Sequence, residues 1–183
     1  MTYYGAQELA NSFRTVRGNT ITIAEDIPEN KYGFRPAPDC RSVAQTLAHI
    51  AVATGFQQHL HGNKITDVTK VNFPELFQRF TAAENQPRSK AEVIAYLKGE
   101  GDKFAAFVES LPEAFLAEQV ALPQGGDRAT KSRFEMLLSA KEHEMHHRGQ
   151  LMTIERMLGI VPHLTRQMNE RMAQAMASQQ APR

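Results

Sequence analysis

Two histidines stand four residues apart in the segment KEHEMHHRGQL, as His143 and His147. Residues four apart share one face of an α-helix, so a helix here presents both imidazoles side by side. Imidazoles that face a core need a partner, because a buried polar group without one is costly. The pair continues an inward seam whose spacings alternate between four and three residues: Met136, Ala140, His143, His147, Gln150, Ile154 and Met157.

A third histidine, His49, has a similar position on another predicted helix, on a stripe with Thr46, Ala53, Phe56 and Leu60. A single histidine on an inward seam is more often a hydrogen-bonded core residue than a metal ligand. A pair of histidines four residues apart does not by itself decide between these two roles. Three neutral imidazoles from two helices, however, match a metal site with three protein ligands and an open coordination position. We therefore predict that His49, His143 and His147 bind one divalent transition metal, with zinc or nickel as the first candidates.

The string from His143 to His147 also matches H-E-x-x-H, the helix motif of zinc metalloproteases. The extended form of that motif needs a glycine and a further histidine, but Gln150 and Thr153 stand at those positions. Such a protease also needs a sheet edge to hold its peptide substrate, and no strand is predicted. We set this interpretation aside and expect Glu144 to be solvated or to support a ligand from behind.

Other polar residues leave alternatives open. Gln150 is expected to orient a ligand or a water molecule, and His146, one residue off the seam, to face outward or toward a neighbour. Arg148 fits either a substrate carboxylate or a structural ion pair. Glu100 fits either a base or fourth ligand, or a side chain that reaches the end of the bundle. We expect structural roles for His59 and His61 at a helix end, His163 in a loop, and Cys40 in a turn.

Four segments with helical periodicity would position these residues, at about residues 4–26, 42–60, 89–111 and 132–158. Prolines and glycines separate the segments, and Gly159 with Pro162 marks the end of the last one. No strand alternation or hairpin signal competes with the helices. The last three segments begin with capping boxes, a serine followed three residues later by glutamine or glutamate: Ser42 with Gln45, Ser89 with Glu92, and Ser132 with Glu135.

The connection at residues 61–88 is the longest, and its apolar patch is expected to form one or two helical turns. A link of this length can return the chain along the bundle, so that the second and third helices run parallel. We predict an all-α fold over residues 1–162, a four-helix bundle with up-down-down-up topology. Residues 163–183 are expected to form a short helix that docks through its methionines, followed by a polar tail; a recruitment surface is the alternative.

Composition limits the classes of partner. With 21 basic and 20 acidic residues, the 183-residue chain has a formal charge of +1, so a nucleic-acid partner is not expected. The sequence shows no secretory leader pattern and no apolar run near the roughly 20 residues of a membrane helix, so no membrane partner is expected. The single cysteine, Cys40, excludes an internal disulfide. We predict a cytoplasmic protein.

Apolar residues outside the inward seams predict a homodimer. A bundle buries one stripe for each helix; some of the surplus apolar surface must pack on neighbouring helices, and what remains exposed favours a partner subunit. Two helices carry such a surplus, the last with Phe134, Leu138, Met145 and Met152, and the second with Val43, Leu47 and Ile50.

Two longer motifs carry a family resemblance. The proline-rich turn and Ser-capped helix DIPENKYGFRPAPDCRSVAQTLAHIAVA and the paired-histidine helix EHEMHHRGQL resemble the two signatures of the DinB/YfiT-like superfamily of metal-binding four-helix bundles. The resemblance covers roughly residues 5–160. It implies the up-down-down-up topology, a frequent homodimer, and His49, His143 and His147 as ligands of a divalent metal. It also implies relatives that use bacillithiol, mycothiol or glutathione in S-transfer, and a maleylpyruvate isomerase.

The sequence leaves three functions open. The first is a metal-dependent enzyme that presents a low-molecular-weight thiol as thiolate, or activates water for hydrolysis, toward a small-molecule substrate. The second is a metal-binding or stress-response protein without turnover. The third is a dimeric structural module with a vestigial site.

Overall fold

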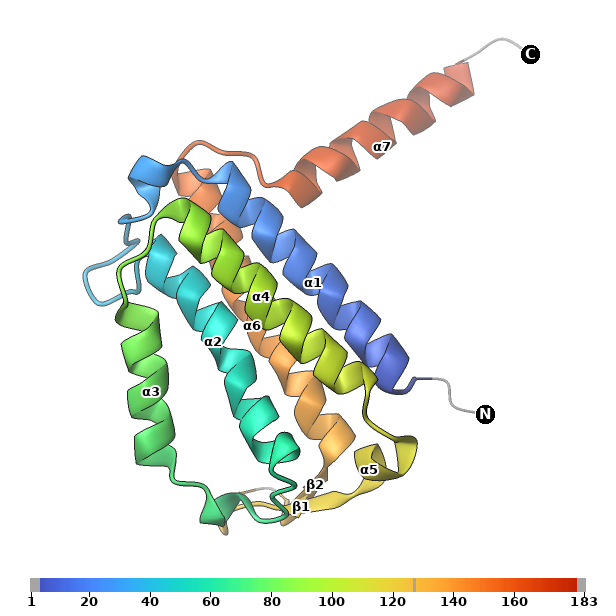
Figure 1. The fold of residues 1–183 in the computed structure, drawn as a ribbon. Coiled ribbons are helices and arrows are strands. Elements are labelled where there is room, and N and C mark those ends of the chain that lie inside the picture. Colours follow the sequence, from blue (N-terminus) through green and yellow to red (C-terminus); the bar gives the residue numbers. More distant parts are fainter. Residues whose placement is uncertain (1–3, 127, 181–183) are drawn as a thin grey trace.

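The computed structural model describes residues 4–126 and 128–180, and four long helices form its body (Figure 1). These are α1 (Ala6–Asp26), α2 (Val43–Gly62), α4 (Lys90–Glu109) and α6 (Arg133–Met157). In Figure 1, α1 and α6 run in one direction while α2 and α4 run in the other. The predicted four-helix bundle with up-down-down-up topology is confirmed.

The parallel course of α2 and α4 depends on α3 (Phe73–Asn85), which returns the chain along the bundle and packs on α2 (Figure 1). The expectation of one or two turns is wrong, because α3 has 13 residues. Asn72 caps its first turn by accepting from the Glu75 backbone N–H, and Pro74 stands early in the helix, where a proline is tolerated. Leu76 of this helix is buried against the bundle.

The serine caps begin the helices as predicted. Ser42 and Ser89 form complete capping boxes with Gln45 and Glu92 at the starts of α2 and α4. Ser132 accepts from the Glu135 backbone N–H at the start of α6, while the Glu135 side chain pairs with Arg128 instead of returning to the cap. Each cap satisfies a backbone donor that the first helical turn leaves free.

Short elements fill the connections, and two of them are strands that the sequence analysis did not predict. They are the 3₁₀ turns η1 (Glu29–Lys31) and η2 (Val68–Lys70), the helix α5 (Glu113–Ala117), and the strands β1 (Gln119–Ala121) and β2 (Thr130–Ser132). The strands pair antiparallel, with Val120 opposite Lys131. Each strand is only three residues long, and Val120 alone is fully buried. Two such segments are too short to show an alternating pattern.

Helix α2 buries more than one face, because it packs against α3, α4 and α6. Val43, Leu47 and Ile50 are therefore core residues in contact with apolar side chains of α1, α4 and α6. They belong to the part of the surplus that packs on neighbouring helices, so none of the three is left exposed for a partner. In the second stripe of α6, Phe134, Leu138 and Met152 are half-buried against the core, and Met145 is exposed.

A buried ion pair joins the four helices at mid-height. The Arg17 guanidinium on α1 donates to both carboxylate oxygens of Glu144 on α6, at 2.9–3.1 Å. It also donates to the Leu97 carbonyl of α4 at 2.7 Å and to the Ile50 carbonyl of α2 at 3.3 Å. Gly101 makes space for the Arg17 side chain, because a Cβ at this position would lie only 2.9 Å from it. The expectation of a solvated or ligand-supporting Glu144 is wrong, because this pair holds the carboxylate in the core.

The last helix, α7 (His163–Gln180), projects away from the bundle (Figure 1). Only its beginning is anchored, where His163 is buried and Arg166 pairs with Asp26 of α1 at 2.7 Å. Its three methionines are 50–59% exposed. The expectation that these methionines dock on the bundle is wrong, because the helix leaves the bundle before they are reached. In the described part of the chain, no helix is long and apolar enough to cross a membrane.

Candidate metal centre

Three histidine side chains meet where α2 and α6 pack together. His49 lies in the second turn of α2, and His143 and His147 lie on adjacent turns of α6. The Nε2 atom of His143 lies 3.1 Å from that of His49 and 3.2 Å from that of His147. Donor atoms of all three residues lie within 4.8 Å of one another. The structure thus brings together the three residues that the sequence singled out.

The distances from His143 Nε2 to the other two Nε2 atoms fit the coordination shell of one metal ion. At a metal–nitrogen distance of about 2.0–2.1 Å, nitrogens 3.1–3.2 Å apart subtend roughly 95–106° at the metal. That range lies between the angles of an octahedral shell, about 90°, and of a tetrahedral one, about 109°. Three protein ligands leave at least one coordination position for a water molecule or a substrate.

Two of the imidazoles are held by hydrogen bonds at their outer nitrogens. His49 Nδ1 lies 3.0 Å from Glu84 Oε2, and His147 Nδ1 lies 2.8 Å from Gln150 Oε1. Because carboxylate and amide oxygens only accept, each Nδ1 carries the proton, and each Nε2 is left with a lone pair. Hydrogen bonds of this kind fix the tautomer and the ring orientation of metal-binding histidines.

The inward nitrogens cannot satisfy one another. His49 and His147 both present an Nε2 lone pair within the cluster, and the neutral His143 can offer at most one proton at its Nε2. At least one of these lone pairs therefore finds no donor in the cluster, which is unfavourable for a partly buried group. A cation between the three rings satisfies all three nitrogens at once. The residues present thus fit a divalent metal.

Burial also favours the protonation state that a metal needs. It lowers the pKa of His49 and of His147 below the ordinary value. It lowers the pKa of His143 to about 4, and the neighbouring imidazoles add to that effect. Near pH 7 all three side chains are therefore neutral, and only a neutral imidazole offers a metal its lone pair.

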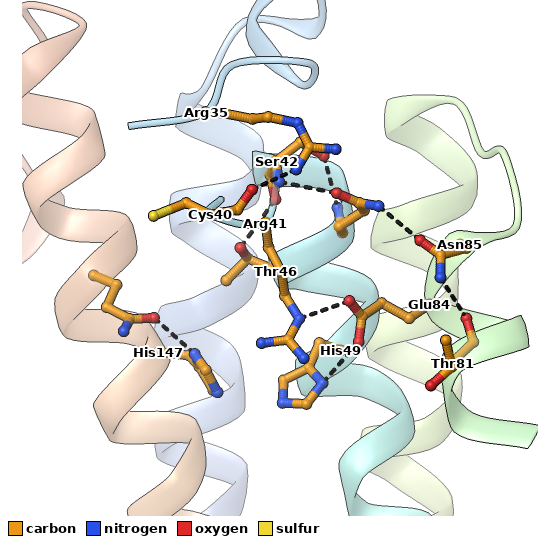
Figure 2. A network of polar contacts seen from close by, with 12 residues as sticks. Arg35, Cys40, Arg41, Ser42, Thr46, His49, Thr81, Glu84, Asn85 and His147 are labelled. Carbon is orange, nitrogen blue, oxygen red and sulfur yellow. Dashed lines mark hydrogen bonds and ion pairs between the residues drawn. The ribbon is translucent and has the colours of Figure 1, made fainter. Parts of the chain in front are cut away.

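Glu84 and Arg41 complete the site, and the sequence analysis missed both. Glu84 lies near the end of α3, where one carboxylate oxygen meets His49 and the other accepts from Arg41 Nε at 2.6 Å. Figure 2 shows Arg41 extending from the turn before α2 toward Glu84 and His49. Glu84 was missed because the expected one or two helical turns would end before it and leave it in an irregular connection. The Asn72 cap followed by Pro74 was the signal that a helix begins at this point.

Gln150 and His146 lie as the sequence predicts. The Gln150 amide oxygen holds His147, and its nitrogen lies 3.2 Å from Nε2 of His146. His146 is exposed and stays out of the group of converging nitrogens. Gln150 thus orients one candidate ligand.

Glu100 and Arg148, whose roles the sequence left undecided, take no part in the histidine cluster. Glu100 on α4 pairs with Lys103 at 2.8 Å. Arg148 has no carboxylate within ion-pair distance among the described residues, so the structural ion pair considered for it is not present there. Neither side chain lines the cavities beside the histidines.

Two further histidines are buried away from the cluster. His61 lies between Gln57 Oε1 at 3.0 Å and the Arg133 guanidinium at 3.2 Å, instead of at the carbonyls of a helix end. Burial, with the Arg133 charge, lowers the pKa of His61 to about 4. His163 begins α7 and lies 3.2 Å from Asn19 Oδ1, so it is not a loop residue. Both have structural roles at bundle ends.

Two cavities open beside the cluster. The larger, of about 760 Å³, lies next to His147 and has a mixed lining, in which Asp39, Gln150 and Thr153 stand beside apolar side chains such as Ile154. The smaller, of about 410 Å³, lies next to His49 and His143. Arg41 and Glu84 line both cavities, and Cys40 lines the larger one. Space for a small molecule therefore adjoins the three nitrogens.

The family model of the DinB superfamily matches residues 12–151 of the chain. This stretch runs from α1 into α6 and includes all three clustered histidines. The chain belongs to the DinB superfamily. The family resemblance carried by the two histidine motifs is thereby confirmed.

Among DinB-like proteins, YjoA from Bacillus subtilis is 27% identical over 154 residues, which cover 84% of this chain and 91% of YjoA. Its crystal structure, described as that of a DinB-like protein, has a TM-score of 0.61 at 22% identity and covers 83% of this chain and 92% of that one. These values indicate that the bundle is shared over nearly the whole of YjoA.

Two other solved structures of similar fold carry descriptions of function. YfiT from Bacillus subtilis, described as "a probable metal-dependent hydrolase with an unusual four-helix bundle topology", has a TM-score of 0.65 at 12% identity, over 87% of this chain and 91% of YfiT. A mycothiol-dependent maleylpyruvate isomerase has a TM-score of 0.62 at 13% identity, over 82% of this chain and 63% of the isomerase. At such identities these likenesses establish the fold alone.

Proposed function

We propose that this DinB-like protein is a metal-dependent enzyme in which His49, His143 and His147 bind one divalent transition metal, zinc or nickel. The observation that carries the proposal is the convergence of three Nε2 atoms whose rings are held from outside by Glu84 and Gln150. A three-histidine site with open positions is typical of catalytic metals, whereas structural zinc sites use four protein ligands.

A divalent metal at this point supplies Lewis acidity, which lowers the pKa of a bound water or thiol and polarises an electrophile. The chain provides the surroundings of that chemistry. Glu84 keeps the His49 tautomer fixed, and Gln150 does the same for His147. Arg41 adds a positive charge at the border of both cavities, where it can attract an anionic group of a small-molecule substrate.

The reaction classes that we propose are hydrolysis and transfer to or from a low-molecular-weight thiol. The description of YfiT supports the first, and the mycothiol dependence of the isomerase supports the second. Proteolysis through H-E-x-x-H is disfavoured, because Glu144 pairs with Arg17 in the core and is unavailable as a base. The alternative is a metal-binding or stress-response protein without turnover.

The expectations for partners and location remain proposals. We propose a small-molecule partner and no membrane partner, and we disfavour nucleic acid because the net charge is near zero. The proposal of a cytoplasmic location rests on the single cysteine. We retain the homodimer as a proposal, now on the exposed methionine face of α7.

Turnover by the metal-loaded protein tests the proposal. Zinc- and nickel-loaded samples are assayed with activated esters and amides, and with electrophiles in the presence of glutathione, bacillithiol or mycothiol. We expect turnover that needs metal and is lost in His143→Ala but kept in His146→Ala. Stoichiometric metal without turnover in any of these assays would favour the non-catalytic alternative.

A further inference from the structure

The smaller cavity beside the histidines has an aromatic wall. Phe56 of α2 and Phe77 and Phe80 of α3 line it, together with Val52, Ala53 and Ala140. Phe77 is 61% exposed although it is a large apolar side chain on a well-formed helix. Cavities of about 300–1,000 Å³ with mostly apolar linings and a few polar groups are typical of small-molecule sites. At about 410 Å³, this cavity lies within that range.

The aromatic wall is held in place by α2. A Cβ at Gly55 would lie 3.2 Å from the Phe80 ring, so the glycine lets this ring pack directly on the helix. Phe56 and Phe73 stack with their centroids 5.9 Å apart, and Phe73 stacks on Phe77 at 5.8 Å. The side chains that line the cavity are thus supported by packing, and the apolar surface is already formed.

The polar groups of this cavity lie at the metal centre. His49, His143 and Glu84 line it together with the aromatic wall, whereas His147 lines the larger cavity. A ligand atom on an open coordination position would therefore adjoin two spaces of different character. The larger one has a mixed lining with many polar and charged side chains, and the smaller one offers mainly apolar carbon.

We propose that the ligand of the metal centre is an amphipathic small molecule, whose metal-binding group bears an aryl or branched alkyl group that occupies the aromatic cavity. This inference rests on the proposed function, because it needs a metal at the histidines. The aromatic cavity then selects substrates by the group next to the reacting atom. The larger cavity takes their polar or anionic remainder, with Arg41 as the positive charge at the border.

Hydroxamates of graded size test the inference without any assay of turnover. A hydroxamate binds a metal through two oxygens, so acetohydroxamate and benzohydroxamate differ only in the group that the metal site presents to its surroundings. Protein loaded with Co²⁺ reports binding through its visible absorption. We expect benzohydroxamate to bind at least about tenfold more tightly than acetohydroxamate, since the phenyl ring leaves water for an apolar wall.

Two matched substitutions distinguish the cavities. Ala53→Leu places a larger side chain in the aromatic cavity, and Thr153→Leu does the same in the larger one. We expect Ala53→Leu to abolish the preference for benzohydroxamate while acetohydroxamate binding and Co²⁺ content stay unchanged. Thr153→Leu should keep the preference. Phe80→Ala provides a second variant, in which the preference falls because part of the wall is removed.

The outcomes separate the two proposals. A chain that takes up no Co²⁺ overturns the proposed function and this inference with it. A chain that takes up Co²⁺ but binds both hydroxamates equally overturns the inference alone. A preference that Thr153→Leu removes and Ala53→Leu keeps also overturns the inference, because the apolar group would then occupy the larger cavity.

Discussion

Glu84→Gln tests whether the carboxylate behind His49 contributes to metal binding. Glu84 accepts from His49 Nδ1 at 3.0 Å and from Arg41 Nε at 2.6 Å, with its side chain 12% exposed. The substitution keeps the size of the side chain but removes the negative charge that makes the His49 Nε2 lone pair a stronger ligand for the metal. It also removes one acceptor oxygen, so that the amide nitrogen opposes either Arg41 or His49, both of which are donors.

Loss of an outer hydrogen bond of this kind costs about 10–100-fold in metal affinity, which corresponds to about 1.4–2.8 kcal/mol. Competition with a chromophoric chelator for Zn²⁺, at one pH and buffer composition, measures the change. Glu75→Gln is the matched control, because Glu75 lies in the same helix and its carboxylate contacts only the Asn72 amide among the described residues. An affinity of Glu84→Gln within twofold of the wild type would refute the role assigned to this carboxylate.

Three further predictions concern the bundle. Glu144→Ala leaves Arg17 charged and buried, so urea unfolding should show that the free energy of unfolding falls by about 3–5 kcal/mol. Glu142→Ala, at an exposed neighbour, should change it little, and equal losses in the two variants would contradict this. The pKa of His61 is about 4 in the folded protein and near 6.5 in the unfolded chain. Its contribution of roughly 3 kcal/mol to the free energy of unfolding should therefore be fully present above about pH 6.5 and be lost as the pH falls toward 4. Metal-free His61→Gln should therefore show a shallower fall of stability over that window than the wild type, and an equal slope would contradict this. Sedimentation at micromolar concentration should give the mass of a homodimer, and a monomer mass would contradict the proposed assembly.

Much of the fold could be predicted because each long helix is encoded locally. The caps at Ser42, Ser89 and Ser132 begin helices where the sequence indicates, and the seam spacings give the helical type. The candidate ligands could be found because two of them are neighbours on one helix. The length of the 61–88 connection was enough to infer the parallel pair of helices.

The errors have a common cause in the tertiary arrangement. A sequence seam assigns one inward face to each helix, but α2 packs against three helices and buries Leu47 and Ile50 as well. Glu144 appears off the seam and is nevertheless buried, because Arg17 comes from a helix 127 residues away in sequence. Glu84 belongs to the site only because α3 folds back beside α2, and no local pattern encodes that contact.

Metal stoichiometry in two histidine variants tests the central claim most directly. Protein purified without a histidine tag is dialysed against Zn²⁺, freed of excess metal and analysed by elemental mass spectrometry. The arrangement of nitrogens predicts about one zinc per chain in the wild type and in His146→Ala, and almost none in His147→Ala, because two imidazoles on separate helices chelate weakly. Zinc retained by His147→Ala but lost from His146→Ala would contradict the site described here.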